Sequence, residues 1–115
     1  MKLLECIRKI EAEVVVGEDW LDLEVESVAA SDLLSDVLAT AKHNFLLLTG
    51  LSTPQVVRTA ELMGSVGVVF VRGKYPPQEA IGMATVHKVP LLCTPLDMFE
   101  SCCRLANCGL EQITD

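Results

Sequence analysis

Short runs of consecutive apolar residues recur in the second half of the chain, separated by segments in which apolar residues follow helical spacing. Continuous apolar runs of this length are typical of parallel strands that are buried on both faces of a sheet. A Thr-Pro or Pro-Pro pair follows each run and predicts a helix start, because proline fits the first helical position. The predicted strands cover residues 45–48, 66–71 and 89–93, and the predicted helices after them cover 53–64, 76–88 and 94–109.

The first third of the chain is less regular. Apolar residues at helical spacing predict a helix over 2–11, and a β-branched run predicts a short strand at 14–16. Residues 23–28 alternate between apolar and polar side chains, which predicts a strand with one wet face at an edge of the sheet. Either Ser31 or Asp32 is predicted to cap the next helix, which extends to residue 41.

Strands separated by helices of about ten residues indicate an α/β fold. We therefore predict one domain over residues 1–115, a small three-layer domain with a mainly parallel sheet and helices on both faces. In such folds ligands bind beside the carboxyl ends of the strands.

Composition and charge narrow the classes of function. The chain has 115 residues, 50% of them hydrophobic, and a net charge of −7. This hydrophobic content excludes a disordered chain, and the acidic balance argues against nucleic-acid binding, which needs a basic face. No apolar run is as long as the roughly 20 residues that are needed to span a bilayer. Charged residues within the first eight positions argue against a signal peptide. We expect a cytoplasmic protein without nucleic-acid or membrane partners.

The charge is concentrated in one part of the chain. Residues 1–36 hold three cations and ten acids, whereas residues 37–115 hold six of each. The later loops can therefore form a locally positive pocket that the total charge does not reveal.

Five cysteines and no export signal predict reduced thiols. Cys102, Cys103 and Cys108 do not recur at a spacing of three or four residues, so they share no helix face and predict no metal site. Cys93 at a strand end is either a redox-sensitive thiol or a small buried side chain.

Polar residues gather in the loops after the predicted strands. Glycines there let a backbone approach a ligand closely, hydroxyls bind phosphate or ribose oxygens, and basic side chains supply countercharge. Helix N-termini at the same edge favour anions. The candidate residues for a small anion or a nucleotide are Asp32, Thr49, Gly50, Ser52, Thr53, Arg72, Gly73, Lys74 and Thr94. In the alternative interpretation these are ordinary turn and helix-start residues with no ligand.

Catalytic motifs are absent from the sequence. It contains no P-loop, no G-x-G-x-x-G after a strand and no G-x-S-x-G. His43 and His87 lie near predicted helix ends without an evident nucleophile, so we predict no enzyme activity and no cofactor. Arg58 faces either the candidate site or solvent, and Trp20 either covers the core or anchors a partner.

The chain resembles the DRTGG domain family over nearly its full length. The resemblance rests on Asn44 to Ser52, on Val68 to Pro76, and on Lys88 to Thr94 with Asp97-Met98-Phe99 beyond them. Ala30 to Ser35 is similar to the segment that free-standing members carry before the first core strand. The family's second glycine is replaced by Leu51.

The resemblance implies a fold similar to the non-catalytic N-terminal domain of HPr kinase/phosphorylase, without the kinase domain. Family members also occur in regulated pyrophosphatases beside CBS domains, where they look like regulatory or dimer-forming modules. The first hypothesis is a non-catalytic, homodimeric regulatory module that binds a small anionic ligand and acts through an unknown protein partner. The alternative is a dimerisation or protein-interaction module with no ligand.

Overall fold

The computed structural model describes residues 1–40 and 44–112. The helices in these residues are α1 (Leu3–Lys9), α2 (Leu34–Thr40), α3 (Pro54–Met63), α4 (Gln78–His87) and α5 (Met98–Asn107), with a short 3₁₀ turn, η1, at Glu18–Trp20. The strands are β1 (Glu13–Val16), β2 (Ser27–Ala30), β3 (Phe45–Thr49), β4 (Gly67–Phe70), β5 (Leu91–Cys93) and β6 (Glu111–Gln112).

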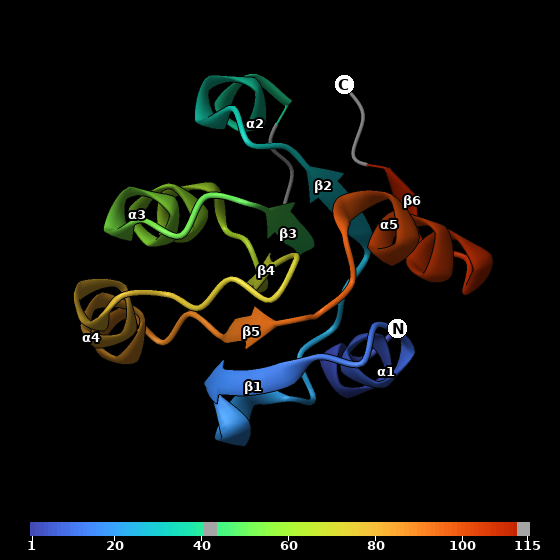
Figure 1. Cartoon of the computed structure of the whole chain (residues 1–115), viewed down its shortest axis with the longest axis horizontal. Coiled ribbons are helices and arrows are strands. Elements are labelled where there is room, and N and C mark those ends of the chain that lie inside the picture. Colours follow the sequence, from blue (N-terminus) through green and yellow to red (C-terminus); the bar gives the residue numbers. More distant parts are fainter. Residues whose placement is uncertain (41–43, 113–115) are drawn as a thin grey trace.

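The strands form one sheet in the order β1-β5-β4-β3-β2-β6. All neighbouring strands are parallel except β1, which pairs with β5 in the antiparallel direction. Helices α2, α3 and α4 lie on one side of the sheet, and α1 and α5 lie on the other (Figure 1). The predicted three-layer α/β architecture with a mainly parallel sheet is therefore confirmed.

The alternating direction of side chains along the central strands builds two cores. Phe45 and Leu47 of β3 pack into the core under α2, α3 and α4, whereas Leu46 and Leu48 pack into the core under α1 and α5. Both faces of β3 are buried, which explains why its sequence is a continuous apolar run. Trp20 packs against the first core, as the core-covering interpretation predicts.

The predicted strand at 23–28 is wrong in its boundaries and in its place in the sheet. The strand β2 begins at Ser27 and runs to Ala30, and β6 pairs with its outer side, so β2 is not the edge. The N–H of Leu3 donates to the carbonyl of Leu23, so the segment before β2 pairs with the start of α1 instead of with a strand. The alternation at 23–26 therefore reflects contact with the N-terminus, and β6 is too short to leave a periodic signal.

Three helices also begin later than predicted. Helix α4 begins at Gln78 instead of residue 76. Helix α5 begins at Met98 instead of residue 94, and its cap is Asp97, whose side chain accepts the N–H of Glu100 at 2.8 Å. Helix α2 begins at Leu34, after a turn in which the Ser31 hydroxyl accepts the N–H of Leu33. The predicted end of this helix at residue 41 and His43 lie outside the described residues.

Candidate ligand site at the carboxyl edge of the sheet

The loops after β2, β3, β4 and β5 form one continuous edge. The N–H of Arg72 donates to the carbonyl of Leu96, and that of Gly73 donates to the carbonyl of Thr94, each at 2.8 Å. The N–H of Ser31 donates to the carbonyl of Leu48 at 3.0 Å. These bonds hold the four strand ends in fixed positions relative to one another.

Asp32 organises the loop between β3 and α3. Its Oδ1 accepts the N–H of Gly50 at 2.5 Å and the hydroxyl of Thr49 at 3.2 Å. The Thr49 hydroxyl also accepts the N–H of Leu51 at 3.1 Å, and its side chain is fully buried. Thr49 therefore builds the loop, and its hydroxyl is occupied within the protein.

Gly50 lies beneath two opposite charges. A Cβ at this position would lie 3.2 Å from Nη2 of Arg72 and 3.2 Å from Oδ1 of Asp32. This is tighter than ordinary van der Waals contact, so a larger residue here would displace the ends of both side chains by a few tenths of an ångström. The sequence therefore predicted correctly that Asp32, Gly50 and Arg72 belong to one edge, and the structure places them in contact range.

Arg72 has a left-handed backbone conformation, with φ of 59°, and Gly73 follows with φ of 69°. For a residue with a Cβ this conformation costs about 1–2 kcal/mol. The turn directs the Arg72 side chain back toward Gly50. Lys74, two residues further along the chain, is exposed.

Thr94 turns inward. Its hydroxyl donates to the carbonyl of Ile10 at 2.5 Å and accepts the N–H of Leu96 at 3.2 Å, and its side chain is fully buried. Both hydrogen-bonding directions of this hydroxyl are used within the protein. Among the candidate residues, the side chains that reach solvent at this edge are those of Asp32, Ser52, Thr53, Arg72 and Lys74.

Arg58 lies away from this edge. With Glu61, Leu62, Met83 and His87 it lines a surface hollow of about 300 Å³ between α3 and α4. Nδ1 of His87 lies 3.4 Å from Oε1 of Glu61 in an exposed pair. Of the two interpretations of Arg58, the structure supports the solvent-facing one.

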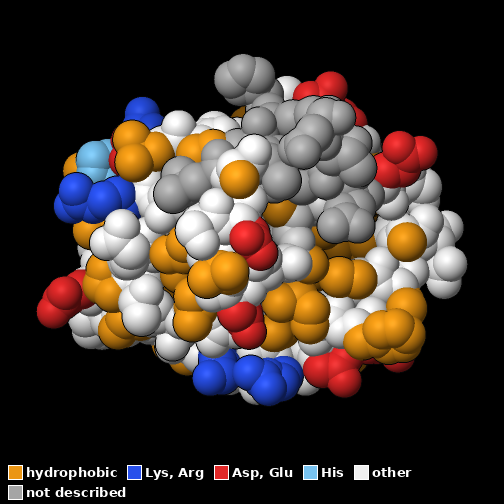
Figure 2. Space-filling view, turned by 90° about the horizontal axis from the view of Figure 1, so that it is seen from above, with side chains coloured by type: hydrophobic (Ala, Val, Ile, Leu, Met, Phe, Trp, Pro, Cys, Tyr) orange, Lys and Arg blue, Asp and Glu red, His pale blue; other side chains and the backbone are white. Residues whose placement is uncertain are grey.

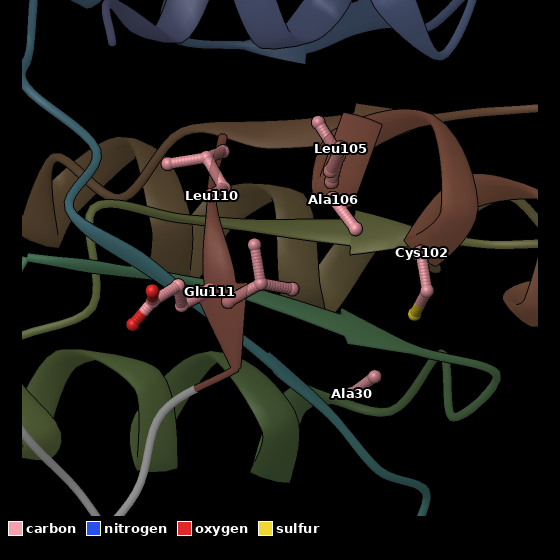
Figure 3. Close-up of a pocket in the computed structure, with 7 residues that line it drawn as sticks. Ala30, Cys102, Leu105, Ala106, Leu110 and Glu111 are labelled. Atoms are coloured by element: carbon pink, nitrogen blue, oxygen red, sulfur yellow. The ribbon is translucent and has the colours of Figure 1, made fainter. Parts of the chain in front are cut away.

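An apolar pocket beside the carboxyl edge was missed by the sequence reasoning. It has a volume of about 310 Å³ and is lined by Val28, Ala30, Cys102, Leu105, Ala106, Leu110 and Glu111. Ala30 and Cys102 lie at one end of the pocket, and Leu110 and Glu111 lie at the other (Figure 3). Its walls come from segments more than 70 residues apart, so no local sequence signal reveals it.

The molecular face that carries α2 and β6 is chemically mixed. It exposes groups of hydrophobic side chains interspersed with acidic ones, and basic side chains lie at its lower edge and at its left end (Figure 2).

The thiols are free, and burial suppresses the ionisation of several of them. Burial raises the pKa of Cys93 to about 11, and the carboxylate of Glu13 acts in the same direction. Thiolate is therefore scarce at Cys93 near neutral pH, which makes it a poor nucleophile.

No group of three or more His, Cys, Asp or Glu within residues 1–40 and 44–112 is arranged to hold a metal ion. None of the described helices combines the length and apolar character needed to cross a membrane.

The sequence matches no protein-family model and no curated protein. Among solved structures, the chain is similar to the CBS and DRTGG domains of the regulatory region of Clostridium perfringens pyrophosphatase, a structure complexed with the activator diadenosine tetraphosphate. The TM-score is 0.76 at 14% sequence identity, and the match covers 90% of this chain and 45% of the other. The chain thus spans less than half of that structure's chain, and at this identity the similarity establishes a related α/β fold.

Proposed function

We propose that this chain is a non-catalytic regulatory domain of the DRTGG type, which binds a small anionic ligand such as a nucleotide and acts through a protein partner. The observation that carries the proposal is the position of Arg72. Its guanidinium lies over Gly50 at the carboxyl edge, although its backbone conformation is unfavourable for arginine. Lys88 shares the same backbone conformation at the end of α4, so the conformation by itself does not mark a site; the place of the Arg72 guanidinium at the carboxyl edge supports the proposal.

The neighbouring groups support the same chemistry. Lys74 adds a second exposed cation to the loop, and Ser52 and Thr53 lie before the N-terminus of α3. Anions are favoured there, because the first N–H groups of a helix lack partners within the helix. The similar pyrophosphatase structure is a regulatory region complexed with diadenosine tetraphosphate, which supports a regulatory role and makes this compound a suitable probe.

Thermal unfolding in the presence of nucleotides, diadenosine tetraphosphate, inorganic phosphates and organic acids tests this proposal. A ligand at 100 times its Kd stabilises the fold by about 2.7 kcal/mol, which raises the Tm by several degrees. We expect Arg72→Ala to abolish the shift and Arg58→Ala to leave it unchanged, since Arg58 is an exposed arginine away from the edge. The proposal fails if no compound raises the Tm or if both variants respond like the native chain.

A second candidate function is a dimerisation module without a ligand. It is favoured by the exposed apolar side chains of Leu62 on α3 and Val86 on α4, which are 73% and 74% exposed. The two helices are neighbours on one side of the sheet (Figure 1). The described residues of this face carry both signs of charge, so it lacks the strong acidic character of the first third of the chain.

A further inference from the structure

The apolar pocket between β2, β6 and α5 extends to Ala30, the last residue of β2. Val28 and Ala30 line the pocket, and Asp32 follows Ala30 by two residues. Ser31 and Asp32 form the turn after β2, in which the Ser31 hydroxyl accepts the N–H of Leu33 at 2.9 Å. The carboxylate of Asp32 reaches the N–H of Gly50, so the end of β2 connects the apolar pocket to the charged edge.

Helix α5 supplies the opposite wall. Cys102, Leu105 and Ala106 are spaced three and four residues apart, so they share one face of the helix. Alanine at two of the lining positions and a partly exposed thiol leave a space of about 310 Å³. This lies at the lower end of the range of about 300–1,000 Å³ that is typical of small-molecule pockets.

The hydrogen bonds of Asp32 leave one carboxylate oxygen free among the described residues. Both bonds, to Gly50 and to Thr49, use Oδ1. Oδ2 lies 3.4 Å from the position of a Cβ at Gly50, and Nη2 of Arg72 lies 3.2 Å from the same position. A free carboxylate oxygen accepts a hydroxyl group, whereas it repels a phosphate, so this position suits the sugar of a ligand.

We propose that the pocket binds the base of a nucleotide whose sugar hydroxyl is accepted by Asp32 and whose phosphate is bound by Arg72 and Lys74. The inference rests on the proposed anion-binding function and specifies the ligand class for that site. Asp32 follows the pocket residue Ala30 by two positions, and Asp32 and Arg72 both approach Gly50, so groups that suit a base, a sugar hydroxyl and a phosphate occur close together in the fold. Inorganic phosphate or an organic acid uses only the last of these three parts.

Calorimetric titration of the full chain with ADP, ribose 5-phosphate and pyrophosphate tests the inference. We expect ADP to bind at least about tenfold more tightly than ribose 5-phosphate, which is about 1.4 kcal/mol. Ala106→Leu fills the pocket and should weaken ADP binding about tenfold while leaving pyrophosphate binding unchanged. Ala39→Leu, at an exposed alanine on α2 outside the pocket lining, is the matched control and should change neither.

The titrations separate the two proposals. Binding of pyrophosphate and ADP with equal affinity, or ADP binding that Ala106→Leu does not weaken, overturns the base pocket and leaves the anion site standing. Failure of all three compounds to bind overturns both.

Thiol labelling gives a second readout that does not depend on the folding of a variant. Cys102 lines the pocket, whereas its neighbour Cys103 does not. Saturating ADP should slow the alkylation of Cys102 and leave that of Cys103 unchanged, as measured by peptide mass spectrometry. Equal labelling rates of Cys102 with and without bound ADP contradict the inference.

Discussion

Arg72 adopts a backbone conformation that glycine adopts without strain. Replacing it by glycine relieves about 1–2 kcal/mol of that strain, but the unfolded chain gains freedom worth about 0.5–1 kcal/mol. We therefore expect Arg72→Gly to raise the free energy of unfolding by up to about 1 kcal/mol. If the side chain binds the ligand, the same variant loses the ligand-induced Tm shift. Chemical denaturation and thermal shift measure the two effects separately.

Lys88 provides the control for this prediction. It has φ of 58° at the end of α4, far from the candidate residues in the chain. Lys88→Gly should give a similar stabilisation and keep the ligand response. A ligand response that survives in Arg72→Gly argues against a direct role for the arginine.

Two buried thiols make stability sensitive to alkaline pH. Burial raises the pKa of Cys6 and of Cys93 from 9.0 to about 11 in the folded chain. Between these values the unfolded chain releases the thiol protons first, so folding stability is complete below pH 9 and falls as the pH rises toward 11. We expect a loss of roughly 1–3 kcal/mol per thiol over this range.

Denaturant unfolding at pH 8 and pH 10.5 measures this loss. A Cys6→Ala/Cys93→Ala double variant is less stable at pH 8, because it loses buried volume, but it should lose less stability between the two pH values. An equal loss in both proteins would show that other groups cause the pH dependence.

At the scale of elements, the buried hydroxyl of Thr94 connects the end of α1 to the segment between β5 and α5. Thr94→Val keeps the shape of the side chain but leaves the Ile10 carbonyl and the Leu96 N–H without this partner. We expect a destabilisation of about 1–3 kcal/mol, since buried polar groups without partners are costly. Thr53→Val is the control: Thr53 is exposed and its side chain makes no capping hydrogen bond, so this variant should stay within about 0.5 kcal/mol of the native chain.

The segment between β5 and α5 also shows where prediction from the sequence failed. The Thr-Pro pair at 94–95 has the composition of a helix start, yet the hydroxyl turns into the core and α5 begins three residues after Pro95. The apolar strands β3 and β4 were predicted to within one residue at each end, and β5 with its start two residues early, because burial on both faces leaves a continuous apolar run. The start of β2 was predicted too early, because apolar and polar residues alternate over 23–26 in the same way whether that segment pairs with a strand or, as here, with the N-terminal residues.

At the scale of the whole molecule, the α3 and α4 face is the surface on which we expect a second copy to dock. Gly82 lies on this outer face, and a Cβ there would meet nothing within 4 Å. Glycine inside a helix costs about 0.5–1 kcal/mol relative to alanine, so Gly82→Ala should stabilise the monomer. Close approach of a second helix at Gly82 would make the same change weaken the dimer.

Sedimentation over a range of concentrations measures the association. We expect a species of twice the monomer mass, and Leu62→Glu or Val86→Glu should prevent its formation. Phe99→Glu is the control, because Phe99 is 78% exposed on α5, on the opposite side of the sheet. A monomer at every concentration, or a dimer that tolerates both charged variants, excludes this face as the interface.

The sequence by itself determined the elements whose burial is periodic and the edge at which their loops end. It predicted a mainly parallel sheet between two helical layers, because runs of apolar residues and helix-start prolines are local signals. It also placed Asp32, Gly50 and Arg72 in loops of one edge. Only the tertiary structure decided which polar groups face inward. The hydroxyls of Thr49 and Thr94 donate hydrogen bonds to Asp32 and to the Ile10 carbonyl, which lie in distant segments. The apolar pocket likewise forms only when residues 28–30 and 102–111 come together, since each segment supplies one wall and neither shows in its own sequence that a space remains between them.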